Sequence, residues 1–300
     1  MPAGKMHADE PDIDAALVRR LVAAQFPHWA GLPVKPVDSV GTSNAMYRLG
    51  EDKVVRLPRI AGAAQDIGAE RLWLPRLAPS LPVAIPEPLG QGAPGEGYPW
   101  PWSVLRWLDG ENPARGRLPD PGRLARDLAQ FVTALHRIDP AGGPASYRSE
   151  SLAERDGSIR RAIEALSGSL DADAVTAAWD ADRQAEAWPG PAVWIHADLQ
   201  PGNLLVADGG LSAVIDFGCA GLGDPAVDLI AAWYVLPRQA RDTFRAGVGA
   251  DGAAWARGRA WALSVALMEA DYYGETNPAM AATARYVIGE VLADHAARSA

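Results

Sequence analysis

The chain has 300 residues, of which 48% are hydrophobic and 22% charged, and its formal net charge is −9. This composition is that of a folded globular protein rather than a disordered chain, and the negative charge argues against a nucleic acid or an anionic membrane as partner. The single cysteine, Cys219, excludes an intramolecular disulfide and Cys-based zinc sites.

The N-terminal segment is polar and then acidic, without the apolar core of a signal peptide. No apolar run approaches the roughly 18 to 20 residues that a membrane span requires. We therefore expect a cytoplasmic protein. The first predicted element is a helix over residues 12–25, where Ile13, Leu17 and Leu21 recur at helical spacing.

Three short strands are predicted next, over residues 37–40, 45–49 and 53–57. The first two are joined by the turn Gly41-Thr-Ser-Asn44, which is small and rich in donors. Such a turn can form a backbone nest for phosphates, so Gly41, Ser43 and Asn44 are candidate nucleotide contacts. The alternative is an ordinary hairpin turn. Alternation places Val54 and Arg56 on the same face of the third strand.

A helix is predicted over residues 61–77, with Glu70 near its middle. Residues 101–108 read as an apolar strand that runs into the Gly-containing and Pro-containing segment 109–113. We place the boundary between two lobes there. The predicted domains are residues 1–108 and residues 109–300, and the second is expected to be mainly helical, beginning with helices over 121–136, 152–166 and 174–188.

The most informative segment is Trp194-Ile-His-Ala-Asp-Leu-Gln-Pro-Gly-Asn203, followed by Ala213-Val-Ile-Asp-Phe-Gly218. It places His196, Asp198, Asn203 and Asp216 in the order and spacing of a kinase catalytic loop and metal-binding turn. A carboxylate must face the acceptor hydroxyl, and we assign Asp198 to that role, with His196 fixing the loop. Mg²⁺ prefers oxygen ligands, which Asn203 and Asp216 supply.

The residues between these motifs predict a hairpin. Residues 204–206 and 211–215 read as paired strands around an Asp-Gly turn. This hairpin is expected to return Asn203 and Asp216 to the same end. Taken singly, each motif is better explained as an ordinary polar loop, in which such side chains satisfy the backbone of a turn. Two strand-end carboxylates joined by a hairpin of this length favour the catalytic interpretation.

The remainder of the chain is predicted to be helical. Asp224-Pro225 forms a helix start, with residues 226–236 as its helix, and two further helices cover 253–271 and 277–297. The side chains of Glu269, Asp271 and Tyr272 form a candidate acidic and aromatic rim for a substrate. The alternative for these charges is a solvated helix end.

The segments His196-Ala-Asp-Leu-Gln-Pro-Gly-Asn203, Ile215-Asp-Phe-Gly218 and Gly223-Asp-Pro-Ala-Val-Asp-Leu229 resemble those of the aminoglycoside phosphotransferase family. The resemblance extends weakly over most of the chain. It implies an α+β fold with the two lobes of a protein kinase: an antiparallel sheet with a helix, then a mainly helical lobe. It also implies ATP or GTP as donor, Mg²⁺ as cofactor, and a hydroxyl group of an antibiotic or metabolite as acceptor.

Several residue roles follow from this resemblance alone. Arg56 occupies the position at which kinases carry a phosphate-binding Lys, and Glu70 is its expected ion-pair partner. An exposed strand Arg and a solvated helix Glu are the alternatives. The hinge residues Arg106, Trp107 and Leu108 are expected to contact the nucleotide base, although any one aromatic is as readily explained as core. Asp228 is expected to hold the backbone of the catalytic loop.

Three functions remain open from the sequence. The first is a kinase for an antibiotic of the aminoglycoside or a similar kind, and the second is a kinase for a metabolite such as an amino alcohol or sugar derivative. The third is a silent nucleotide-binding module, suggested by Arg56 in place of Lys. A protein substrate is not expected, since only five residues separate Gly218 from Asp224, too few for an activation segment.

Overall fold

The structure is a computed structural model that describes residues 10–37 and 43–299. The chain divides into two compact units. Unit 1 comprises residues 1–111 together with 212–218, and unit 2 comprises residues 112–211 together with 219–300. The sequence predicts a boundary near this position but does not predict that residues 212–218 join the first unit.

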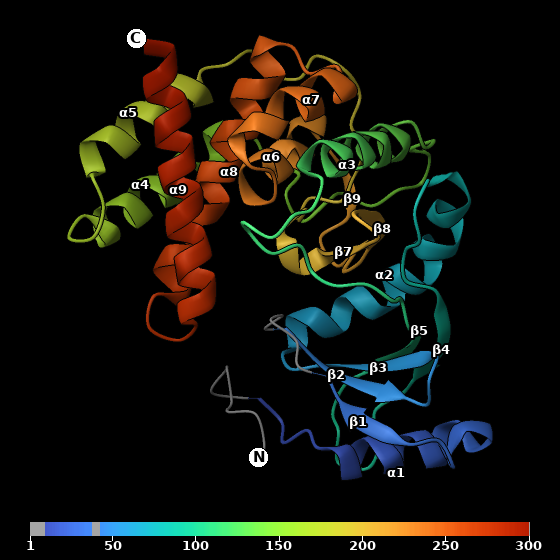
Figure 1. The fold of residues 1–300 in the computed structure, drawn as a ribbon. Helices are drawn as coiled ribbons and strands as arrows, with labels where there is room; N and C mark the ends of the chain where they lie inside the picture. Colours follow the sequence, from blue (N-terminus) through green and yellow to red (C-terminus); the bar gives the residue numbers. More distant parts are fainter. Residues whose placement is uncertain (1–9, 38–42, 300) are drawn as a thin grey trace. The chain divides into compact units, whose positions relative to one another are not determined.

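Unit 1 is an antiparallel sheet with two helices (Figure 1). The strand order is β1-β2-β3-β5-β4. The strands are β1 (Val34–Pro36), β2 (Asn44–Leu49), β3 (Lys53–Pro58), β4 (Pro88–Gly92) and β5 (Trp102–Arg106). The helices are α1 (Ala15–Gln25) and α2 (Ala61–Leu77), with the short 3₁₀ turns η1 (Pro27–Trp29) and η2 (Ala78–Ser80).

The predicted elements of unit 1 are confirmed for α2, β2, β3 and β5, with small shifts at the ends. The sequence analysis missed β4, because this strand contains Pro88 and two glycines, which are rare in strands. The strand predicted over 37–40 lies, except for its first residue, outside the described residues. Its neighbour β1 ends at Pro36, and residues 38–42, which include Gly41, lie outside the described residues.

The core of unit 1 lies between the sheet and α1, where Leu17, Leu21, Tyr47 and Val104 are buried. Trp102 of β5 closes one end of this core. Its indole lies directly against Gly92 of β4, where a Cβ atom would come within 2.0 Å of the ring. Only glycine therefore fits at position 92 beside this tryptophan.

Unit 2 is mainly helical (Figure 1). Its helices are α3 (Pro121–His136), α4 (Leu152–Leu166), α5 (Ala172–Arg183), α6 (Ala231–Tyr234), α7 (Arg238–Val248), α8 (Gly252–Tyr273) and α9 (Pro278–Ser299). The short segments are β6 (Val193–Ile195), η3 (Pro201–Asn203), β7 (Leu204–Ala207), β9 (Gly221–Gly223) and η4 (Pro225–Ile230). β8 (Gly210–Val214) pairs with β7 and runs from unit 2 into unit 1.

α8 is the central helix of unit 2 and packs against α4, α5, α9 and η4. Residues on all of its sides are buried, which explains why it carries no clear polar face. The buried Arg259 of α8 forms two hydrogen bonds of 2.6 Å with Asp182 of α5. Because both charges are buried, this pair fixes the packing of α5 against α8.

Several helices start at the polar residues that the sequence offers. Asp120, Asp171 and Asp251 cap α3, α5 and α8, and Ser151 forms a capping box with Glu154 at α4. The helices predicted over 121–136 and 152–166 are confirmed at both ends. Among the described residues, no helix is long and apolar enough to cross a membrane.

Two helix predictions for unit 2 need correction, and one helix was missed. The helix predicted over 226–236 is a 3₁₀ helix, η4, followed by only one turn of α-helix, α6. α5 ends at Arg183 rather than at 188, and α7 was not predicted. The fold class is nevertheless the predicted one, α+β, with an antiparallel sheet followed by a helical part.

Candidate active site

The carboxylate of Asp198, in the predicted catalytic loop of unit 2, accepts hydrogen bonds from three side chains. Its Oδ1 accepts from Arg148 Nη1 at 3.0 Å and from Gln200 Nε2 at 3.1 Å, and its Oδ2 accepts from Asn203 Nδ2 at 2.7 Å. The Asp198 side chain is 22% exposed, so an outside group can still reach it. A fixed yet accessible carboxylate suits a group that orients a substrate hydroxyl.

The backbone of the catalytic loop is held by Asp228, as the sequence predicts. The backbone N–H groups of His196 and Ala197 donate to the two oxygens of this fully buried carboxylate, at 3.1 and 2.8 Å. His136 Nε2 lies 3.0 Å from the same carboxylate. His136 is therefore part of the scaffold, in agreement with its predicted position at a helix end.

Ala197 has a left-handed backbone conformation with φ 67°. This conformation costs a residue with a side chain about 1 to 2 kcal/mol. The bonds around Ala197 offset that cost and turn the chain so that Asp198 follows directly. His196 Nδ1 accepts the Asp198 N–H at 3.2 Å, a contact suited to a residue that fixes the loop.

Asn203 ends η3, five residues after Asp198. Its Nδ2 donates to both the backbone carbonyl and the carboxylate of Asp198, at 2.8 and 2.7 Å. With the amide nitrogen so occupied, the amide oxygen is directed elsewhere and suits a hard cation. The predicted partner ligand, Asp216, belongs to unit 1, so their joint role stays a prediction.

Glu269 of α8 joins the same network through Gln200. Gln200 Nε2 donates to Glu269 Oε1 at 2.6 Å, and the Tyr234 hydroxyl donates to Glu269 Oε2 at 2.9 Å. Burial and then the negative charge of Asp198 raise the pKa of Glu269 to about 7, against the opposing effect of its hydrogen bonds. The other two predicted rim residues, Asp271 and Tyr272, are exposed.

Arg148 is a site residue that the sequence analysis missed. It lies between α3 and α4, about 50 residues before Asp198, outside any motif. Burial opposes its charge, but Asp198 and Glu269 more than compensate, so the pKa of Arg148 is raised and its guanidinium stays charged. The run Ser146-Tyr-Arg148 carries no pattern that would have revealed this contact.

In unit 1, Arg56 and Glu70 form the predicted ion pair. Arg56 Nη1 lies 2.9 Å from Glu70 Oε1, and Nη2 lies 2.5 Å from Oε2. Both side chains are buried, with about 5% exposed. The pairing itself is confirmed, and a surface-exposed strand Arg is excluded. A role of this pair in binding nucleotide phosphates stays a prediction.

Two further carboxylates, Asp66 of α2 and Asp216, interact electrostatically with Arg56. Asp216 has a left-handed backbone with φ 62°, in the turn after β8. Burial raises the pKa of Asp66, Arg56 lowers it and Asp216 raises it again, with a net increase. Arg56 thus contacts one carboxylate, that of Glu70, and two more act on its charge from a distance. Negative charge exceeds positive charge in this group, an imbalance that a bound cation would relieve.

This donor set fits Mg²⁺, which is usually held by one or two protein oxygen ligands, waters and substrate phosphates. Asp216 supplies such a carboxylate and Asn203 such an amide oxygen. Within residues 10–37 and 43–299, no cluster of three or more His, Cys, Asp or Glu side chains forms a metal cage.

The hinge residues Arg106 and Trp107, which are predicted to contact the nucleotide, already form contacts with other residues of unit 1. The backbone N–H of Arg106 donates to Glu87, and that of Trp107 donates to Asp52. Arg48 stacks over the Trp107 ring at 3.9 Å from its centroid. These two N–H groups are thus occupied, and Leu108, next in sequence, is half-buried.

The predicted phosphate turn is described only in part, at Ser43 and Asn44. The Ser43 carbonyl accepts from the Arg59 N–H at 2.8 Å. Asn44 begins β2, and its buried Oδ1 has no hydrogen-bond partner among the described residues. The nest expected around Gly41 lies outside the described residues and stays a prediction.

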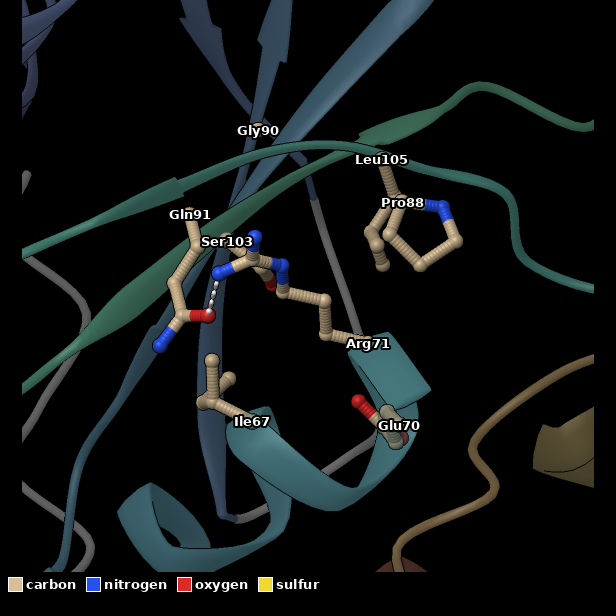
Figure 2. Close-up of a pocket in the computed structure, with 8 residues that line it drawn as sticks. All are labelled: Ile67, Glu70, Arg71, Pro88, Gly90, Gln91, Ser103 and Leu105. Atoms are coloured by element: carbon tan, nitrogen blue, oxygen red, sulfur yellow. Dashed lines mark hydrogen bonds between the residues drawn. The ribbon is translucent and has the colours of Figure 1, made fainter. Parts of the chain in front are cut away.

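Unit 1 also contains a small pocket between α2 and the strands β4 and β5 (Figure 2). Figure 2 shows Arg71 of α2 reaching across it to Gln91 of β4, where their side chains are 3.2 Å apart. Glu70 and the buried Ser103 border the same space. The pocket lies beside the Arg56–Glu70 pair and is too small for a nucleotide.

The sequence matches the phosphotransferase enzyme family over residues 34–261. No curated protein matches it. Among solved structures, the GDP complex of an aminoglycoside 2'-phosphotransferase-IIIa has a TM-score of 0.73 and 19% identity, covering 94% of this chain and all of that one. A macrolide 2'-phosphotransferase from Brachybacterium faecium has a TM-score of 0.63 and 22% identity, covering 91% and 97%. These likenesses confirm the predicted kinase-like fold.

Proposed function

Because this chain belongs to the phosphotransferase enzyme family, we propose that it transfers the γ-phosphoryl group of ATP or GTP to a hydroxyl group of a cationic antibiotic. The observation that carries the proposal is the carboxylate of Asp198. It is fixed by Arg148, Gln200 and Asn203 and remains partly exposed. This arrangement is suited to orienting an alcohol rather than to binding alone.

The proposed chemistry draws on residues of both units. Asp198 accepts the hydrogen bond of the acceptor hydroxyl and aims its oxygen at the γ-phosphorus. Arg56, held by Glu70, binds the donor phosphates with a permanently charged guanidinium. Asn203 and Asp216 are the proposed Mg²⁺ ligands. When bound, Mg²⁺ neutralises the charge of the phosphates.

The proposed acceptor is an aminoglycoside or another cationic antibiotic such as a macrolide. Related structures have been determined as complexes with kanamycin and gentamicin, although their sequences are only 20% and 15% identical to this one. In this chain, the net charge of −9 favours a positively charged acceptor. A cytoplasmic location, where nucleoside triphosphates are available, belongs to the same proposal.

The test is an acceptor panel with the purified full chain. Aminoglycosides, macrolides, amino alcohols and sugar derivatives are incubated with Mg²⁺ and either ATP or GTP, and phosphorylated products are identified by mass spectrometry. We expect an antibiotic product with the wild type. The Asp198→Asn variant is expected to lose about 10³-fold in kcat, because it keeps the shape of the side chain but not its charge.

Two outcomes of the panel would contradict the proposal. A product only from amino alcohols or sugar derivatives would identify a metabolite kinase instead. Nucleotide binding without any phosphorylated product would support the silent module. Full activity of Asp198→Asn would overturn the role of this carboxylate even if the acceptor were the expected one.

A further inference from the structure

Arg148 contacts the catalytic loop at two successive residues. Its Nη1 donates to the carbonyl of Ala197 and to Oδ1 of Asp198, the latter at 3.0 Å. The Arg148 side chain is 11% exposed. A buried guanidinium is thus directed at the group that we assign to the acceptor hydroxyl and at the peptide immediately before it.

Ala197 is held from both sides by charged groups. Its N–H donates to Asp228 at 2.8 Å, and its carbonyl accepts from Arg148. Since Ala197 is in the left-handed region, with φ 67°, its conformation persists only where the surroundings fix it. Asp228 and Arg148 together supply that constraint, one at each end of the residue.

The segment that carries Arg148 is docked on β9 by backbone hydrogen bonds. The Ser146 N–H donates to the Leu222 carbonyl at 3.0 Å, and the Leu222 N–H donates to the Pro144 carbonyl at 2.7 Å. β9 in turn pairs with β6, the strand that leads into His196. Arg148 therefore reaches the loop from a segment held by the same small sheet.

Gly221 permits this docking. A Cβ atom at position 221 would lie 2.6 Å from the Ser146 nitrogen and 2.7 Å from the carbonyl carbon of Ala145. These are backbone atoms, so a side chain at position 221 would displace the segment rather than rotate a neighbour aside. The position of Arg148 therefore depends on the absence of a side chain at Gly221 of β9.

We infer that Arg148 is a positioning residue for Asp198. Its guanidinium holds the Ala197 peptide and Oδ1 of Asp198, so that Oδ2 keeps a lone pair for the acceptor hydroxyl. The inference rests on the proposed role of Asp198. Both contacts come from the single nitrogen Nη1. A lysine ammonium could therefore make one or both of them, but it is a point charge on a flexible stem and lacks the fixed plane of a guanidinium, so we expect it to replace Arg148 only in part.

The first test is kinetic and uses Arg148→Ala, Arg148→Lys and the control Arg161→Ala, an exposed arginine of α4. We expect Arg148→Ala to lower kcat about 100-fold while both KM values change less than about threefold, since the residue acts on orientation and not on ground-state binding. Arg148→Lys should retain part of the activity. Millimolar guanidinium should restore part of the kcat of Arg148→Ala.

The second test is structural and does not depend on turnover. Crystal structures of the wild type and of Arg148→Ala are compared at Ala197 and Asp198. We expect Ala197 to leave the left-handed region or the Asp198 carboxylate to rotate away from Asn203. Gly221→Ala, which keeps Arg148 but displaces its segment, should give the same change, and Arg148→Lys serves if Arg148→Ala does not fold.

The outcomes separate this inference from the proposed function. If the wild type phosphorylates an acceptor and Arg148→Ala has unchanged kcat, the inference is wrong and the function stands. If the wild type phosphorylates nothing, the function is wrong and the crystal structures decide the inference alone. An unchanged loop in Arg148→Ala overturns the inference in either case.

Discussion

Arg56 occupies the position at which the sequence predicts a phosphate-binding cation, with arginine in place of lysine. The guanidinium uses two nitrogens on Glu70, at 2.9 and 2.5 Å, while burial opposes its charge and the surrounding carboxylates maintain it. Lysine would present a single ammonium to the same carboxylate. Arginine in place of lysine therefore keeps the positive charge at position 56. Because two of its nitrogens bind Glu70, the orientation of the guanidinium depends more strictly on this glutamate.

This dependence predicts the effect of Glu70→Ala. Without its partner, the Arg56 guanidinium is no longer aimed, so we expect the KM for the nucleotide to rise about tenfold and the KM for the acceptor to stay within about twofold. Steady-state kinetics with each substrate varied in turn provides the measurement. The matched control is Glu51→Ala, an exposed glutamate of the same unit. An unchanged KM for the nucleotide would show that the Arg56–Glu70 pair does not contribute to binding of the nucleotide.

Glu269 predicts a pH dependence of stability. In the unfolded chain this glutamate ionises near pH 4.5, whereas in the folded protein its pKa is raised to about 7. Between these values the folded state holds the extra proton, so this group's contribution to stability falls as the pH rises through the window. Above it, the ionised side chain destabilises the folded state by roughly 2 to 3 kcal/mol at most.

Glu269→Gln should remove that dependence. We expect the variant to gain stability relative to the wild type at pH 8 but not at pH 5, as measured by urea denaturation at a series of pH values. The difference between variant and wild type isolates this group from other titrating residues. Glu164→Gln, at an exposed position of α4, is the control. A difference that does not vary with pH would contradict the raised pKa.

At the scale of single elements, the helices were predicted best. In unit 2, α3, α4, α5 and α8 begin at Asp or Ser residues that cap them through local hydrogen bonds, which sequence alone reveals. η4 was mistaken for an α-helix because Asp224 and Pro225 suit the start of either type. β4 was missed because Pro88 and its glycines satisfy a strand only when β5 lies beside it.

In the candidate site, too, contacts between residues of one motif could be predicted, whereas contacts between distant segments could not. Asp198, Asn203 and Asp228 follow one another closely enough in sequence for their contacts to be predicted from a motif. The contact of Arg148 with Asp198 and that of Gln200 with Glu269 could not be assigned in this way, because they depend on how distant segments pack. Arg148 reaches the site through β9, and Gln200 meets Glu269, which lies 69 residues away.

Two glycines of unit 1 predict opposite effects of the same substitution. Gly92→Ala places a methyl group 2.0 Å from the Trp102 ring, which is held by its hydrogen bond to Ala93, so we expect a loss of about 1 to 3 kcal/mol. Gly68→Ala lies within α2 with nothing within 4 Å of the new atom, so we expect a gain of up to about 1 kcal/mol. Thermal denaturation of both variants provides the comparison. Equal effects would contradict the described packing of Trp102.

At the scale of the whole molecule, the net charge of −9 bears on substrate capture. Attraction of a polycationic acceptor is screened as the ionic strength rises from about 0.02 to about 0.2 M, since the Debye length falls from roughly 20 to roughly 7 Å. We expect the KM for an aminoglycoside to rise severalfold over this range. The KM for an uncharged alcohol should stay constant, and parallel changes for both would indicate a general effect of salt on the enzyme.

Asp228 also has a consequence for the biosynthesis of the chain. The carboxylate that receives the N–H of Ala197 lies 31 residues further along the sequence, so the ribosome completes the loop well before it makes the residue that shapes it. A nascent chain that ends before η4 leaves both loop N–H groups without this acceptor. The catalytic loop therefore acquires the conformation described above only after Asp228 has emerged, and a chain that ends before this residue lacks the group that shapes the loop.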